Sequence, residues 1–156
     1  MEVRAATDRD RDWIRAFLAA RWGSVVVSRG RLLRPEELPA FVAREGRRRV
    51  GLATYATEGE ECELVTIDSL SEGRGVGTAL VEAVAEAARA AGCRRLWLIT
   101  TNDNLRALRF YQRRGFELVA LHRGAIAESR KLKPQISELG EHGIPLRDEL
   151  ELELRL

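Results

Sequence analysis

A glycine-rich segment carries the clearest chemical signal in this sequence. Residues Glu72–Gly77 have the sequence Glu-Gly-Arg-Gly-Val-Gly, and the apolar-periodic stretch that follows, Thr78–Ala91, is predicted to be a helix. Backbone N–H groups and the helix dipole attract anions at a helix N-terminus, and glycines, which have no Cβ atom, let a bulky anion approach closely. Arg74 can add a charge-assisted contact. The segment therefore predicts a site for a diphosphate.

The spacing of these glycines argues against two common phosphate-binding motifs. A dinucleotide fingerprint needs Gly-x-Gly-x-x-Gly, and Thr78 occupies the last of those positions. A Walker A loop needs Gly-Lys-Ser/Thr, but Gly77 is followed directly by Thr78, with no lysine between them. Three glycines can also do no more than make a tight strand-to-helix turn. Taken alone, the segment leaves that structural interpretation open.

A second block, Asn104–Phe116, helps to decide between these interpretations. It reads Asn-Leu-Arg-Ala-Leu-Arg-Phe-Tyr-Gln-Arg-Arg-Gly-Phe and resembles the Asn-x-x-Ala-x-x-Phe/Leu-Tyr-x-x-x-Gly-Phe block of the GNAT family of N-acetyltransferases. The glycine segment resembles that family's Gln/Arg-x-x-Gly-x-Gly/Ala signature, with Glu72 as the one departure. A carboxylate beside a diphosphate is unfavourable unless it points to solvent or pairs with Arg74. The resemblance covers residues 41–122 well and residues 1–40 more loosely.

The resemblance implies that acetyl-coenzyme A is the co-substrate that donates the acetyl group. Its pantetheine arm would enter a splay between the strands expected at 62–67 and 96–99 and would bond to backbone on the first of them. The diphosphate would lie on N–H groups of the glycine segment, and one N–H near Ile67 would polarise the thioester carbonyl. The implied cofactor-binding residues are Val65, Ile67, Gly73, Arg74, Gly75, Val76, Gly77, Thr78 and Asn104. No cluster of His, Cys, Asp or Glu has metal-ligand spacing, so we expect no metal.

Tyr111 is the candidate general acid. Acyl transfer to an amine needs a base for the ammonium, stabilisation of the oxyanion and an acid for the departing thiolate. Tyr111 matches the family tyrosine that protonates the thiolate, and the unperturbed tyrosine pKa of ~10 suits a proton donor at neutral pH. Without the resemblance, Phe110 and Tyr111 could equally be an aromatic pair on the core side of a helix.

The general base is left open by the sequence. Some relatives carry a glutamate on the buried strand, where Ile99 stands here, and another branch carries one at the position of Glu61. Strict alternation places Glu61 and Glu63 on one face of the strand. Val65 and Ile67 share that face, so either glutamate could point into the cleft and act directly or through a water. The alternative is that both are solvated charges.

His122 and His142 are the other side chains that can accept a proton near neutral pH, although a lone loop histidine is more often a surface residue. The departure at Glu72 also leaves a second function open. On the same fold, the chain would be a non-catalytic sensor or interaction domain that binds acyl-coenzyme A.

The acceptor is expected to be a small-molecule or peptide amine bound by the two stretches that match no motif, residues 22–41 and 123–147. The first contains the basic residues Arg29, Arg31 and Arg34, which suit an acceptor with a carboxylate or phosphate. Acidic residues in or beside the second, which suit a cationic acceptor, are Glu138, Glu141 and Asp148. The sequence does not choose between them.

The pattern of apolar residues predicts an α/β (α+β) fold in one N-acetyltransferase domain over residues 1–156. By the resemblance, its sheet of six or seven strands is mixed and mostly antiparallel, flanked by about four helices. Strands are expected at 3–5, 41–43, 49–55, 62–67, 96–99, 116–121 and 150–156, and helices at 9–22, 35–40, 78–91 and 104–114. Residues 25–27 are predicted to be a strand or an ordered loop, 123–147 mostly loop, and the last strand half-exposed.

The composition is that of an ordinary globular domain of 156 residues with a net charge of +2. The charge is modest and forms no basic stripe, so a nucleic-acid partner is not expected. No apolar run approaches the ~20 residues that a membrane span needs, and a cytoplasmic protein without a membrane partner is the default expectation. A homodimer is possible. Cys62 and Cys93 are expected to be buried, reduced side chains.

Overall fold

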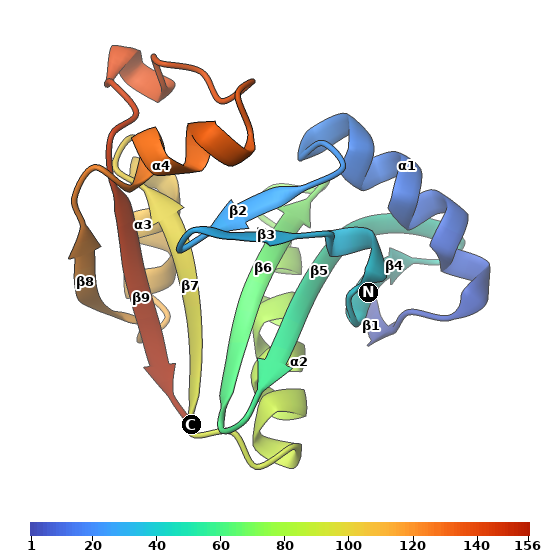
Figure 1. Ribbon diagram of the computed structural model, residues 1–156. Coiled ribbons are helices and arrows are strands. Elements are labelled where there is room, and N and C mark those ends of the chain that lie inside the picture. The colour runs from blue at the N-terminus through green and yellow to red at the C-terminus, as the bar shows by residue number, and fades with distance from the viewer. The chain divides into compact units, whose positions relative to one another are not determined.

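The computed structural model describes residues 1–156 and consists of two compact units (Figure 1). The first unit comprises Met1–Ser24, Arg34–Leu96 and Leu156, and the second comprises Val25–Leu33 and Trp97–Arg155. The chain has four α-helices and a seven-stranded, mostly antiparallel sheet, to which the first unit contributes β1-β4-β5-β6 and the second β7-β9-β8, in that order. The predicted fold class is confirmed.

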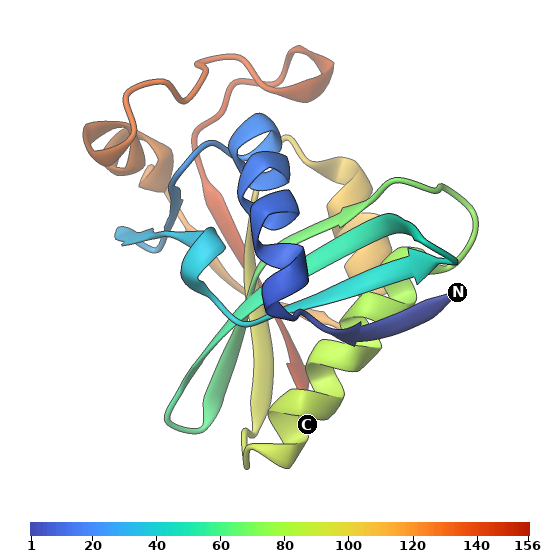
Figure 2. The same ribbon diagram turned by 90° about the vertical axis from the view of Figure 1, so that its right-hand side faces the viewer.

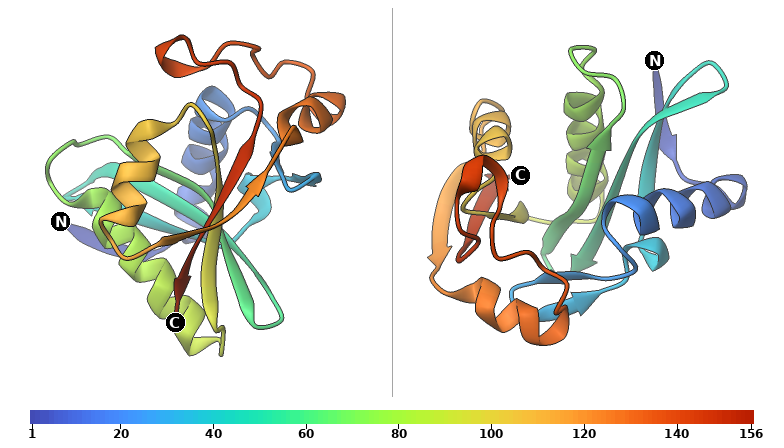
Figure 3. Two further views of the ribbon diagram at one scale, coloured as in Figure 1. Left: turned by 90° about the vertical axis from the view of Figure 1, so that its left-hand side faces the viewer. Right: turned by 90° about the horizontal axis from the view of Figure 1, so that it is seen from above.

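In the first unit, four antiparallel strands lie between two helices. The strands are β1 (Glu2–Ala5), β4 (Ala40–Glu45), β5 (Arg48–Glu58) and β6 (Glu61–Ser69), and the helices are α1 (Arg11–Arg21) and α2 (Val76–Ala90). Helix α1 lies on the face that carries Val42 and Leu52, where its buried residues Ile14 and Leu18 join them in one apolar cluster. Figures 2 and 3 show α1 and α2 on opposite faces of these strands.

Helix α2 comes close to strand β5 at Gly51. A Cβ atom at this position would lie 2.6 Å from Cγ1 of Val76, so only glycine allows the start of α2 to pack so tightly on the strand. The helix begins at Val76, two residues before the predicted start. The buried residues Leu80, Val81, Val84, Ala85 and Ala88 lie on one side of the helix, in keeping with the apolar periodicity that predicts it, and Ala87 is half-buried.

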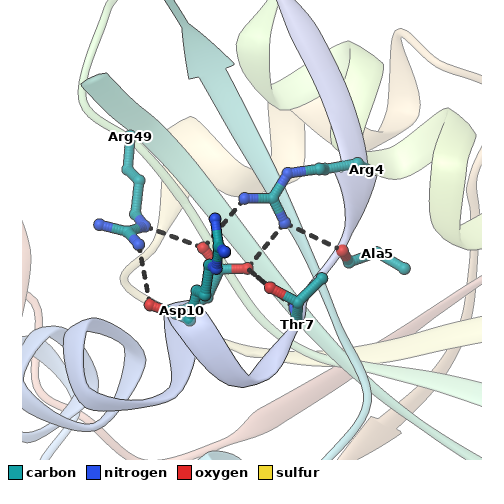
Figure 4. A network of polar contacts seen from close by, with 6 residues as sticks. Arg4, Ala5, Thr7, Asp10 and Arg49 are labelled. Carbon is teal, nitrogen blue, oxygen red and sulfur yellow. Dashed lines mark hydrogen bonds and ion pairs between the residues drawn. The ribbon is translucent and has the colours of Figure 1, made fainter. Parts of the chain in front are cut away.

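A buried carboxylate joins β1, the start of α1 and β5 (Figure 4). Asp10 is 0% exposed, and its side chain accepts hydrogen bonds from Arg4 Nη1 at 2.7 Å, the Thr7 amide at 2.8 Å and Arg49 Nε at 3.0 Å. The hydrogen bond from Arg4 is the largest cause that holds the pKa of Asp10 well below its usual value, against the opposing effect of burial.

Replacing Asp10 by asparagine is expected to lower the free energy of unfolding at pH 7 by about 2–4 kcal/mol, because charge-assisted bonds to two guanidinium groups are lost. Since folding lowers the pKa of this carboxyl, its contribution is complete above the unfolded value of about 4 and declines progressively as the pH falls below it. Urea unfolding at pH 7, 4 and 2.5 should therefore show the gap between wild type and Asp10→Asn narrowing with acid. Asp12→Asn, at a fully exposed carboxylate, is the control and should stay near wild type. A gap that widens with acid would contradict this account.

The second unit contains a three-stranded part of the sheet and a separate hairpin. The strands of the sheet are β7 (Arg95–Thr101), β8 (Glu117–His122) and β9 (Glu149–Arg155), and the first two residues of β7 belong to the first unit. The helices are α3 (Leu105–Gln112) and α4 (Ala125–Leu132). The hairpin consists of β2 (Val26–Ser28) and β3 (Arg31–Leu33). Strand β8 pairs antiparallel with β9, and α3 packs beside β8 (Figure 3).

The prediction that residues 123–147 are mostly loop is wrong for helix α4. Gly124, with a φ of +73°, precedes its first turn, and the buried residues Ile126 and Ser129 lie three positions apart on one side. The buried side of this eight-residue helix carries a single large apolar residue, which is too little to predict a helix from the sequence. The helix predicted at 35–40 is only a 3-10 turn, Pro35–Glu37, and Leu38 is already extended ahead of Pro39.

The final strand differs from its expected pattern of buried leucines and exposed charges. Glu149 and Glu151 are only 2% and 5% exposed, whereas Leu150 and Leu154 are half-buried. Both glutamates have partners in the second unit, described below, and those partners make their burial possible. Cys62 and Cys93 are free and buried as predicted, and burial raises the pKa of Cys62 to about 11. No helix in the structure is long and apolar enough to cross a membrane.

Candidate active site

Strand β6 has a bulge at the position where the cofactor is expected to bond to backbone. Its register with β5 passes from the pair Thr54–Thr66 to the pair Tyr55–Leu64, so Val65 is the extra residue. The extra residue of a bulge stays outside the ladder of hydrogen bonds with the neighbouring strand. The peptide group at Val65 is thus not committed to pairing with β5.

The bulge also changes which side chains share a face of β6. The hydroxyl oxygens of Thr54 and Thr66 lie 2.6 Å apart, so these two side chains are on one face. Counting along β5 from Thr54, the partners of Glu61 and Glu63 lie on that same face, whereas Ile67 pairs with Ala53 on the opposite face. The prediction that the glutamates and Ile67 share one face is therefore wrong, because it assumed strict alternation through the bulge.

The two candidate bases occupy different environments. The side chain of Glu61 is 53% exposed and accepts a 2.8 Å hydrogen bond from Arg95 Nε, beside the turn between β5 and β6. Glu63 is only 4% exposed. At the rise of an extended strand, Glu63 is about 7 Å from the bulge at Val65 and Glu61 about 13 Å. Ile99, which occupies the base position of other relatives, is half-buried and has no titratable group.

Asp68, just after Ile67, is a partly buried carboxylate that the sequence did not single out. Its Oδ2 accepts a 2.7 Å hydrogen bond from the Trp22 indole, and Arg21 lies 3.7 Å from Oδ1. Burial raises the pKa of Asp68, and the hydrogen bond from Trp22 opposes that rise. These contacts attach the end of α1 to the end of β6, on the strand face that Glu63 shares.

The glycine turn leads directly into helix α2. Gly73 and Gly75 have φ values of +72° and +75°, in the left-handed region that favours glycine, and Gly75 is the N-cap residue of α2. Gly75 offers no side chain to cap the first turn, and a Cβ atom added there would meet nothing within 4 Å. Backbone at the start of a 15-residue helix is thus open to a ligand, as an anion site requires.

Arg74 lies in this turn and pairs with a glutamate of strand β4. Its Nη1 is 3.3 Å from both carboxylate oxygens of Glu45 on β4, and two-thirds of its side chain is exposed. An exposed ion pair of this kind contributes little free energy, so an anionic ligand can compete for the guanidinium. The pair with Glu45 depends on the fold of β4, so the sequence did not predict it.

Helix α3 orients Tyr111. The Oδ1 atom of Asn104 accepts a 3.1 Å hydrogen bond from the amide of Ala107 and caps the helix. Tyr111 is 6% exposed and makes edge contacts with the rings of Phe110 and Phe116, at centroid distances of 5.1 and 5.3 Å. Asn104 thus has a structural role through Oδ1, which leaves its Nδ2 group as the part that could reach a cofactor.

A group of polar side chains that bind backbone amides follows strand β7, and the sequence did not predict these contacts. Asp103 is 5% exposed, receives a hydrogen bond from the Thr101 hydroxyl and accepts the Glu141 amide at 2.8 Å. The Asn102 Oδ1 accepts the amides of Arg147 and Asp148 at 3.0 and 3.1 Å. A Cβ atom at Gly140 would overlap the Asp103 carboxylate. A run of polar residues just after an apolar strand was the signal for these contacts in the sequence. It did not show which backbone groups the polar side chains would bind.

The two histidines have different surroundings. His122 Nε2 lies 3.0 Å from Glu151 Oε1, and 30% of the His122 side chain is exposed. His142 is exposed, with a φ of +59°, in the 3-10 turn Glu141–Gly143. No group of three or more His, Cys, Asp or Glu side chains that could hold a metal ion is seen.

Comparison with known proteins identifies the family. The family model described as "Acetyltransferase (GNAT) family" matches residues 5–116. The uncharacterized proteins YdhI and YxbD of Bacillus subtilis strain 168 are 43% and 42% identical to this chain, over 86% and 90% of it and over 85% and 89% of their own lengths. A GNAT family acetyltransferase from Elizabethkingia anophelis, crystallised with acetyl-CoA bound, has the same fold, with a TM-score of 0.71 at 17% identity over 99% of this chain and 97% of its own. This chain belongs to the acetyltransferase (GNAT) family, as its two motifs predicted, and it is an acetyltransferase.

Proposed function

We propose that this acetyltransferase moves an acetyl group from acetyl-coenzyme A to a primary amine by direct attack on the thioester. The observation that carries the proposal lies within the first unit. The bulged strand β6 leads into a left-handed glycine turn, and the turn leads into a helix whose N-cap has no side chain. A relative of the same fold was crystallised with acetyl-CoA bound, which supports the choice of donor.

The backbone of the first unit supplies most of the proposed contacts to the donor. The diphosphate binds the amides of the segment Gly73–Thr78 and displaces Arg74 from its exposed pair with Glu45. The pantetheine arm bonds to backbone at Val65 and Ile67, and an amide at the bulge polarises the thioester carbonyl. The Nδ2 group of Asn104 adds a further contact from α3.

Tyr111 and Glu63 are the proposed acid and base. The amine nitrogen gives a proton to the base and forms a bond to the carbonyl carbon. The carbon–sulfur bond then breaks, and Tyr111 protonates the departing thiolate. Glu63 takes precedence over Glu61 because it is buried and closer to the bulge, whereas Glu61 is exposed and paired with Arg95. Residues 1–156 are proposed to act as one catalytic domain in the cytoplasm, without a nucleic-acid or membrane partner.

An acceptor screen tests the function. Thiol release from acetyl-coenzyme A is measured with amino acids, polyamines, aminoglycosides and peptides, each beside a matched alcohol or tertiary amine. We expect turnover with primary amines only, and an N-acetylated product of the corresponding mass. Tight binding of acetyl-coenzyme A without turnover on any amine would instead favour the non-catalytic sensor that the departure at Glu72 leaves open.

A further inference from the structure

The tip of the β2–β3 hairpin has an arginine where a turn favours glycine or asparagine. Arg29 has a φ of +50° and Gly30 one of +73°, so the two form a tight left-handed turn. A left-handed conformation costs a residue with a Cβ atom about 1–2 kcal/mol. Such a conformation persists only where the surroundings hold it.

Two buried glutamates of β9 hold this turn. Oε1 of Glu149 accepts the Arg29 backbone N–H at 3.2 Å, and Oε1 of Glu151 lies 3.6 Å from the Arg29 Nε. The same Glu151 oxygen lies 3.0 Å from His122. Because both carboxylates are buried and directed at these partners, their charge stabilises the hairpin tip and is not presented to a cationic ligand.

The hairpin places two guanidinium groups on one indole ring. The Cζ atoms of Arg29 and Arg31 lie 5.4 and 5.5 Å from the ring centroid of Trp97, within cation–π range. Trp97 is 5% exposed, whereas 44% of the Arg29 side chain is exposed and Arg31 is exposed as well. Stacking on a buried ring reduces the freedom of both arginines, so less entropy is lost when they bind a ligand.

This arrangement separates the two acceptor classes that the sequence left open. The cations of the hairpin are exposed and pre-oriented. Among the acidic candidates, Asp148 accepts the amide of Gly124 at 2.9 Å and so has a structural role, and Glu138 and Glu141 lie on the exposed loop after α4. The arginines also share a unit with Tyr111, since β7, which carries Trp97, continues through Asn102 and Asp103 into α3.

We propose that Arg29 and Arg31 select an acceptor that carries a carboxylate or phosphate near its amine. Glu149 and Glu151 act as positioning residues that hold the hairpin tip. A guanidinium presents a planar fork of N–H donors that matches the two oxygens of such an anion, and two of them on one ring favour an anion over a neutral group. The inference rests on the proposed function and names the substrate class of the same reaction.

Matched amines test the selection. Thiol release is compared for β-alanine and propylamine, and for phosphoethanolamine and ethanolamine, so that one pair tests a carboxylate and the other a phosphate. We expect kcat/KM for the anionic member of at least one pair to exceed that of its neutral partner about ten-fold or more. Arg31→Gln should remove most of this preference through KM, and Arg31→Lys should retain part of it. In Arg31→Gln, kcat/KM should fall more for the anionic amines than for their neutral partners.

Arg47→Gln, at an exposed arginine in the turn between β4 and β5, is the matched control and should keep the full preference. Acetyl-coenzyme A binding and the thermal midpoint, measured for each variant, separate a lost contact from a lost fold. A wild-type enzyme that acetylates neutral or cationic amines with no gain from the anion would overturn this inference and leave the proposed function standing. So would an anion preference that survives in both Arg31→Gln and Arg29→Gln. No turnover on any amine would overturn both.

Discussion

Replacing Gly75 by glutamate is expected to weaken acetyl-coenzyme A binding at least about 100-fold, or roughly 3 kcal/mol. Gly75 is the N-cap residue of α2, and an added Cβ atom there meets no protein atom within 4 Å. The Cβ atom of the new side chain would therefore meet no protein atom, and the carboxylate would enter the space proposed for the diphosphate. A carboxylate about 5 Å from a phosphate charge costs roughly 3 kcal/mol at an effective dielectric constant of 20. Binding is measured by isothermal titration calorimetry with coenzyme A.

Gly59→Glu is the matched control for this variant. Gly59 also has a positive φ, +60°, and no atom lies within 4 Å of an added Cβ, but it is in the β5–β6 turn. The nine residues of β6, about 30 Å of extended chain, separate that turn from the glycine segment. Both variants should lose similar stability through left-handed strain, about 1–2 kcal/mol. Only Gly75→Glu should lose binding, and micromolar binding by that variant would mean that the turn is structural only.

Replacing Tyr111 by phenylalanine is expected to lower kcat by about 100-fold while the Kd for acetyl-coenzyme A stays within two-fold of wild type. Phenylalanine keeps the edge contacts with Phe110 and Phe116 and removes only the hydroxyl, the proposed proton donor. Single-turnover rates across pH, together with binding, measure both parts of the expectation.

The only other tyrosine in the chain serves as the control. Tyr55 stacks on Phe41 at a centroid distance of 5.7 Å, and burial raises the pKa of its hydroxyl. Tyr55→Phe removes the same group from a partly buried ring that has no proposed chemical role, so kcat should remain near wild type. Unchanged turnover in Tyr111→Phe would remove that tyrosine from the mechanism.

Features that depend on neighbouring residues along the chain could be predicted from the sequence. The apolar periodicity of α2, the glycines that precede it and the helix that follows Asn104 are all set by residues within a few positions of each other. Helical periodicity and left-handed glycines act over that range, so they leave a local signature. Helix α4 lacks such a signature, because its buried side has few apolar residues, and it was missed.

The face that each side chain of β6 occupies could not be predicted in the same way. Two-residue alternation holds within a strand, but the bulge at Val65 arises from the pairing with β5 and reverses the order beyond it. For this reason Glu61 and Glu63 were assigned to the face of Ile67. The bulge changes which side chains of β6 could lie beside the acceptor amine, and it depends on the pairing of β6 with β5.

By itself, the sequence determined the family and indicated which residues are proposed to bind the donor, because the glycine turn and the block of Asn104 and Tyr111 are short-range motifs. The tertiary structure alone decided the features from which we infer the acceptor. Arg29 and Glu149 stand 120 positions apart in the chain, yet a hydrogen bond joins them, and Trp97 lies under the same hairpin. Pairings between distant residues depend on the folded sheet and leave no pattern along the chain. Only the structure could show that buried glutamates hold Arg29, and that Arg29 and Arg31 lie together on one indole ring.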